Sequence, residues 1–148
     1  MKRIIVCITA LFFTVNTYAQ QQQASAWKTL SLVTYNMEFD ELMGMEVQKP
    51  IYMQPIMDLS GEEVTLKGYI IPLKGEKAQS HFMFSAYPYK MCFFCGNAGP
   101  ETVLQAFTKD KIKVPYTSKA ITIRGKLSLN HGDVNELMYT LTNVVVVE

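Results

Sequence analysis

Two cysteines at C-x-x-C spacing form the strongest chemical motif in this 148-residue sequence, Cys92-Phe93-Phe94-Cys95-Gly96. Two thiolates at this spacing can bind one metal ion, because the turn between them aims both sulfurs at one point. The same two sulfurs can close a disulfide, or they can cycle between the thiol and disulfide states as a redox centre. The motif alone is compatible with all three kinds of site.

A zinc ion at this motif would need further ligands. A structural zinc ion takes four protein ligands, and the sequence has only two histidines, His81 and His131, to complete the set. His81 is the better candidate, because it begins the predicted strand that leads into the cysteine loop. We therefore predict that Zn²⁺ binds to Cys92, Cys95 and His81. An ordinary surface or turn position is the alternative role for each histidine.

The methionines offer a soft-metal variant of the same hypothesis. Met91 adjoins the first cysteine, and the pairs Met43 with Met45 and Met53 with Met57 are spaced to share a face. Thioether and thiolate sulfurs are ligands that copper prefers. The competing interpretation is that these methionines fill gaps in a core, which is their usual role.

The two other interpretations of the cysteine pair have different weaknesses. A disulfide between Cys92 and Cys95 would close a ring of four residues and contribute only about 2 kcal/mol through chain entropy. It is nonetheless the ordinary role of two cysteines in an exported protein. A thiol–disulfide enzyme would need a reactive thiolate at a helix N-terminus on a βαβ scaffold, which the β-rich surroundings disfavour.

The N-terminal segment is typical of an export signal. Residues 1–19 contain two basic residues, an apolar run at 4–15 and a small-x-small cleavage site that ends at Ala19. The apolar run is too short to span a bilayer, which takes roughly 20 residues. We expect a mature chain that begins at Gln20 and is soluble, in the periplasm or outside the cell, with no membrane span after signal removal.

Charge and missing motifs exclude several function classes. Without Lys2 and Arg3 the chain has 12 basic and 13 acidic residues, so it lacks the positive excess of a nucleic-acid-binding protein. The lysines interleaved with aromatic residues at 107–119 are more typical of an exposed edge strand. No phosphate loop or serine nucleophile elbow is present. We therefore predict an exported, non-enzymatic binding module, with a thiol–disulfide redox protein as the alternative.

Alternating apolar residues predict β-strands along most of the chain. The clearest lie at 64–71, 120–130 and 137–147, and Gly68 and Gly125 stand where a small barrel would bend. The other predicted elements are strands at 27–39, 81–86 and 102–108, with a helix as the alternative for the first and the last of these. A turn is predicted at 40–44, followed by a connector that contains Pro50 and Pro55 and by a single helical turn at 55–59.

These elements predict a mainly β fold: a small antiparallel OB-like β-barrel with short helical turns. It would occupy residues 27–148 as a single domain, after a disordered lead-in at 20–26. An immunoglobulin-like sandwich is the alternative fold, but it would need more strands and more regular turns.

Several segments carry a resemblance that spans nearly the whole mature chain: Trp27 with Leu30 and Tyr35; Gly61 with Gly68-Tyr69-Ile70-Ile71-Pro72; Ser85-Ala86-Tyr87-Pro88; the cysteine motif; and Gly99-Pro100-Glu101. In these segments the chain resembles a family of small exported bacterial proteins of unknown function. The family is OB-like, and some members are encoded beside transporter components in zinc-responsive operons. The resemblance implies an accessory role in envelope metal handling, with zinc as the metal and an envelope transporter or another protein as the partner. Other branches of the family have a proline-rich stretch with a single cysteine where this chain has its cysteine pair.

Overall fold

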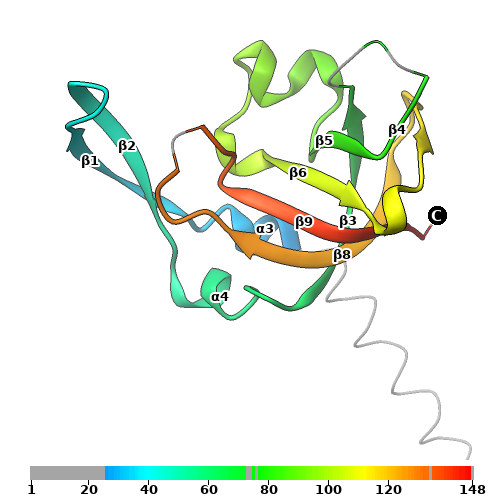
Figure 1. Cartoon of the computed structure of the whole chain (residues 1–148), viewed down its shortest axis with the longest axis horizontal. Coiled ribbons are helices and arrows are strands. Elements are labelled where there is room, and N and C mark those ends of the chain that lie inside the picture. The colour runs from blue at the N-terminus through cyan, green and yellow to red at the C-terminus, as the bar shows by residue number, and fades with distance from the viewer. Residues whose placement is uncertain (1–25, 73–74, 76, 134, 148) are drawn as a thin grey trace, which may run out of the picture.

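A closed five-stranded β-barrel forms the body of the protein in the computed structural model, which describes residues 26–147 except 73–74, 76 and 134 (Figure 1). Its strands are β3 (Glu63–Ile71), β5 (His81–Ser85), β6 (Val103–Thr108), β8 (Ile121–Leu129) and β9 (Tyr139–Val146). Around the ring their order is β3-β5-β6-β9-β8. The predicted OB-like barrel is therefore confirmed, whereas the signal at 1–19 and residues 20–25 of the lead-in lie outside the described residues.

One strand pair departs from the antiparallel prediction. Four neighbouring pairs are antiparallel, and β6 with β9 is parallel. Five strands cannot alternate in direction all the way round a closed ring, because five is odd. One parallel pair is thus a geometric consequence of closing this barrel, which is mixed.

Along each barrel strand, every second side chain points inward, and these side chains fill the barrel interior. The side chains without solvent exposure include Leu66, Phe82, Phe84, Leu104, Ile123, Leu127, Tyr139 and Leu141. Gly68 and Gly125 lie where neighbouring backbone comes close: a Cβ atom would stand 2.3 Å from the Ser85 carbonyl oxygen at Gly68 and 2.8 Å from that of Thr142 at Gly125. The β8–β9 register also shifts at Gly125, between Arg124 and Lys126, as expected for a bend.

The predicted strand at 27–39 is wrong in its first half. Residues Ala26–Leu30 form the short helix α3, and only Thr34–Asp40 form a strand, β1. Ala26 and Leu30 are four positions apart and both buried, which is helical spacing. The indole Nε1 of Trp27 donates to the Lys67 carbonyl at 2.9 Å, so this helix is fastened to β3. No helix in the described chain is long and apolar enough to cross a membrane.

A two-stranded hairpin projects from the barrel, at the left of Figure 1. We call it the arm: β1, a turn at 41–44, and β2 (Met45–Ile51). The predicted turn is confirmed, but the connector predicted around Pro50 contains a strand, β2. Pro50 is tolerated there because β2 pairs only with β1, so its other edge is free in the described structure. The predicted helical turn is confirmed as α4 (Gln54–Met57), with Pro55 in its first turn.

The remaining elements are short. They are β4 (Ala78–Gln79), β7 (Val114–Pro115) and the 3₁₀ turns η1 (Tyr89–Met91), η2 (Phe93–Cys95), η3 (Pro100–Thr102) and η4 (Lys109–Lys111). The lysines predicted on an edge strand are instead on exposed η4 and the segment after it. None of these lysines lies in a strand, so their predicted position on an edge strand is wrong, although the short β7 beside Lys113 pairs only with β4 in the described structure.

Candidate functional site

The two cysteines lie in a loop of residues 86–102 that joins β5 to β6, and we call it the cysteine loop. Its neck is closed by the Ala86 amide, which donates to the Thr102 carbonyl at 2.9 Å. The Thr102 hydroxyl donates to the Gly99 carbonyl at 2.7 Å. Because the first of these bonds continues the β5–β6 pairing beyond Ser85 and Val103, the loop is held at the end of two barrel strands.

Inside the loop, the turns η1 and η2 meet at Cys92. Cys92 has an extended backbone, and the Cys95 amide donates back to its carbonyl at 3.1 Å. Gly96 ends η2 in the left-handed region at φ 75°, which only glycine adopts without strain. This one-turn geometry brings the two sulfurs near each other, as the C-x-x-C spacing predicts.

Both thiols are free, and their surroundings differ. Cys92 is fully buried, whereas Cys95 is exposed. The Cys95 thiol donates to the Tyr89 carbonyl at 3.0 Å. Desolvation, and after it the nearby Cys92 sulfur, raises the pKa of Cys95 above its ordinary value. A raised pKa reduces the thiolate fraction, which is the opposite of what a redox nucleophile requires.

The histidines lie apart from the thiols along the chain's path. His81 is the first residue of β5, and the cysteine loop begins beyond its last residue. The His81 ring stacks on Phe107 with 4.1 Å between centroids, and His131 lies edge-on to Tyr52. Among the described residues, no three His, Cys, Asp or Glu side chains converge as a set of metal ligands. Zinc binding by Cys92, Cys95 and His81 stays a prediction. Of these three residues, only the two cysteines lie in the same loop.

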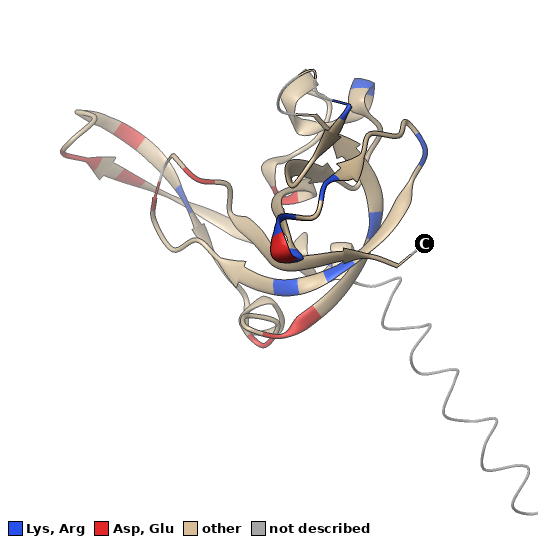
Figure 2. Ribbon diagram, turned by 45° about the vertical axis from the view of Figure 1, so that its right-hand side comes forward, with Lys and Arg blue, Asp and Glu red and all other residues tan. Residues whose placement is uncertain are grey.

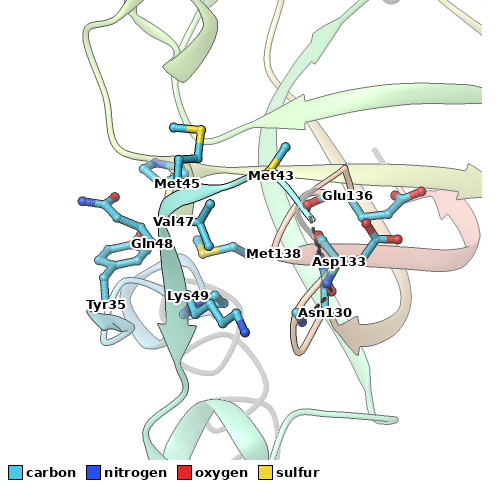
Figure 3. Close-up of a pocket in the computed structure, with 13 residues that line it drawn as sticks. Tyr35, Met43, Met45, Val47, Gln48, Lys49, Asn130, Asp133, Glu136 and Met138 are labelled. Atoms are coloured by element: carbon cyan, nitrogen blue, oxygen red, sulfur yellow. Dashed lines mark hydrogen bonds between the residues drawn. The ribbon is translucent and has the colours of Figure 1, made fainter. Parts of the chain in front are cut away.

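A cleft that the sequence did not reveal lies between the arm and the loop that joins β8 to β9 (Figure 3). Its volume is about 350 Å³, within the range of ligand-binding pockets. The lining residues are Tyr35, Met43, Met45, Val47, Gln48, Lys49, Pro50, Pro100, Asn130, Gly132, Asp133, Glu136 and Met138. β2 supplies much of one wall, and because none of its residues is buried, the sequence carries no periodic signal for this wall.

Asn130 and Tyr52 shape the wall opposite the arm. The Asn130 side-chain oxygen accepts from the amides of Gly132 and Asp133, at 3.0 and 2.9 Å. The Tyr52 hydroxyl, just after β2, lies 2.6 Å from the Asn130 carbonyl and 3.1 Å from that of Met138. Burial raises the pKa of Tyr52 to about 12. Tyr52 thus fastens the base of the arm to the base of the opposite loop.

The charged residues around the cleft differ in whether they are ion-paired. Lys49 is engaged with Glu38, its Nζ lying 2.8 Å from the carboxylate. Asp133 accepts from Asn135, and Glu136 accepts from Gln105. Within the described chain, neither carboxylate forms an ion pair with Lys or Arg. The cleft therefore has the carboxylates of Asp133 and Glu136 on one wall, with Met138 beside them, and Met43 and Met45 of the arm on the other wall (Figure 3).

The cleft and the cysteine loop adjoin each other. Pro100, at the end of the loop, lines the cleft. The Tyr35 hydroxyl of β1 lies 3.1 Å from the Glu101 carboxylate, and burial together with this contact raises the pKa of Tyr35. A molecule bound in the cleft would therefore lie against the segment that follows the cysteines.

No protein-family model matches the chain, and no curated protein matches it. Among solved structures, the chain is similar to a crystal structure of a DUF3299 family protein from Pseudomonas aeruginosa. The two are 17% identical, the match covers 67% of this chain and 68% of that one, and the TM-score is 0.47. The functional conclusion therefore rests on the chain's own residues.

Proposed function

We propose that this protein is an exported, non-enzymatic module that binds zinc through Cys92 and Cys95 and receives the remaining ligands from a partner protein of the cell envelope. One observation carries the proposal: two free thiols lie near each other in a loop fixed to the barrel, one of them exposed. A structural zinc site is closed by four protein ligands, whereas an open site can exchange its metal. An open two-thiolate site suits metal transfer.

The loop supplies distinct roles for its two cysteines. Buried Cys92 anchors the site, and exposed Cys95 is the thiol that solvent and a partner reach. Binding must displace the Cys95 proton from its bond to the Tyr89 carbonyl, so zinc uptake releases protons. The same loop exposes four large apolar side chains that a partner could contact: Tyr87, Tyr89, Met91 and Phe94.

A zinc titration against a chromophoric chelator tests the proposal. We expect one zinc ion per chain, with a Kd of about micromolar, and loss of that binding in C92S/C95S. X-ray absorption should show two sulfur ligands at about 2.3 Å, with the other ligands from water in the absence of a partner.

H81A is the matched control, because it removes a possible ligand from outside the loop. Binding should be unchanged in H81A. Loss of zinc in this variant would instead support the three-ligand site of Cys92, Cys95 and His81. Equal zinc uptake by the wild type and C92S/C95S would refute the proposal.

The thiol–disulfide function is the second candidate, because an exposed thiol beside a buried one can form and reopen a disulfide. The raised pKa of Cys95 opposes it. Alkylation by iodoacetamide at neutral pH separates the two. We expect Cys95 to react no faster than free cysteine, whereas a rate more than about tenfold higher would favour the redox function.

A further inference from the structure

The arm exposes side chains that proteins usually bury. Met37, Phe39 and Leu42 are 52%, 63% and 100% exposed. The arm also exposes all three of its methionines, Met37, Met43 and Met45. Methionine is flexible and polarizable, and surfaces rich in it adapt to the apolar side chains of a partner. The arm therefore has the character of an unoccupied binding surface.

The same arm is acidic. It contains Glu38, Asp40, Glu41 and Glu46 against a single basic residue, Lys49, which already pairs with Glu38. Figure 2 shows red bands along the arm, while most of the blue lies over the barrel. Asp133 and Glu136 add two further carboxylates on the opposite wall of the cleft. In the β1–β2 register, Met45 is opposite Asp40 and Val47 is opposite Glu38, so these cleft-lining apolar residues share a face of the arm with two carboxylates, whereas Met37 and Phe39 lie on its other face.

We propose that the cleft between the arm and the described part of the β8–β9 loop, namely Asn130, Gly132, Asp133, Glu136 and Met138, docks a basic, amphipathic segment of a partner protein. A Lys or Arg of that segment would lie at Asp133 and Glu136, the carboxylates without a described cationic partner. Its apolar side chains would pack on Met43, Met45 and Met138. At about 350 Å³ the cleft has room for a few side chains, so one face of the segment enters while the rest lies along the arm.

The chemistry of the walls disfavours two other occupants. A second copy of this chain would bring its own acidic arm against Asp133 and Glu136, and like charges would then face each other. A copper ion would use the methionine sulfurs but would gain little from carboxylates, which are ligands for harder metals. A basic amphipathic segment matches both the carboxylates and the methionines of the cleft.

This inference is independent of zinc binding, because neither cysteine lines the cleft. The probe is a fluorescent helical peptide of leucine and lysine with its lysines on one face, titrated into the metal-free mature protein. We expect saturable binding that weakens as salt is added. Two comparison peptides separate the contributions: one with glutamate for lysine, and one with serine for leucine. Both should bind at least about tenfold more weakly.

The double variant D133N/E136Q tests the acidic end of the cleft. Asparagine and glutamine keep the side-chain oxygens that accept from Asn135 and Gln105, so the loop should retain its fold. We expect the Kd for the leucine–lysine peptide to rise about tenfold. The matched control E62Q/D110N removes the same two charges from exposed positions outside the cleft and should leave the Kd within about twofold. M43S/M45S should weaken binding to a similar extent as D133N/E136Q.

Three results would overturn the proposal. Equal weakening by D133N/E136Q and E62Q/D110N would mean that the peptide senses only net charge. Sedimentation that shows a dimer dissociated by M43S/M45S would mean that a second copy occupies the cleft. Stoichiometric binding of silver ion, a soft-metal probe, that blocks the peptide and is lost in M43S/M45S would assign the methionines to a metal.

Discussion

At the residue scale, Gly68 shows how a single position sets the shape of the barrel. A Cβ atom there would overlap the Ser85 carbonyl oxygen at 2.3 Å and crowd the Phe84 ring at 3.0 Å. Backbone of the neighbouring strand cannot move aside without breaking the β3–β5 pairing, so β3 accepts only glycine at its closest approach to β5.

We therefore expect G68A to lower the free energy of unfolding by about 1–3 kcal/mol, as overpacking does in a tight core. Chemical denaturation followed by circular dichroism measures it. Gly132 is the matched control, because a Cβ atom there meets nothing within 4 Å. An equal loss in G68A and G132A would show that the close approach at Gly68 is not what destabilises the variant.

At the element scale, the sequence predicts the barrel strands that have a buried face, whereas of the two exposed arm strands it predicts β1 within the strand at 27–39 and misses β2. β3 and β8 alternate strictly about a glycine, so their period is visible without any partner. The arm strand β2 has no buried residue, and Pro50 interrupts it, so no periodic signal exists there. Helix α3 has only five residues, and its two buried residues, Ala26 and Leu30, are four positions apart. That spacing fits one face of a strand as well as one face of a helix. The cysteine motif was visible because it is local, whereas the cleft depends on contacts between residues nearly a hundred positions apart.

Tyr52 joins two of these elements, and it predicts a pH dependence. Its pKa is about 12 in the folded protein and about 10 when unfolded. Above about pH 10 the unfolded chain loses this proton while the folded chain keeps it, so stability falls as the pH rises towards 12.

Y52F should cost about 1–2 kcal/mol at neutral pH, because its hydroxyl contacts the Asn130 and Met138 carbonyls. The difference in unfolding free energy between the wild type and Y52F should then shrink from about pH 9 to about pH 11. Urea denaturation at both values measures it. A difference that grows with pH would contradict this account of Tyr52.

At the scale of the whole molecule, the barrel and the arm are separate hydrogen-bonded units. The barrel closes on itself through five strand pairs, and the arm pairs only within itself. The two units therefore have different roles. The barrel buries the apolar core that stabilises the fold, and the arm leaves its apolar side chains exposed for binding. Tyr52, at the junction, belongs to the barrel side because its hydroxyl contacts the β8–β9 loop.

This division predicts that the barrel folds without the outer part of the arm. Replacing residues 36–49 by a Gly-Ser-Gly-Ser linker removes no fully buried side chain, since all residues of that stretch are exposed or only partly buried. We expect cooperative unfolding with a loss of at most about 1–2 kcal/mol, unchanged zinc binding, and no saturable binding of the leucine–lysine peptide. Thermal unfolding, zinc titration and peptide titration on one sample separate these outcomes. Loss of cooperative unfolding would mean that the arm is part of the folding unit, and retained peptide binding would place the docking surface elsewhere on the barrel.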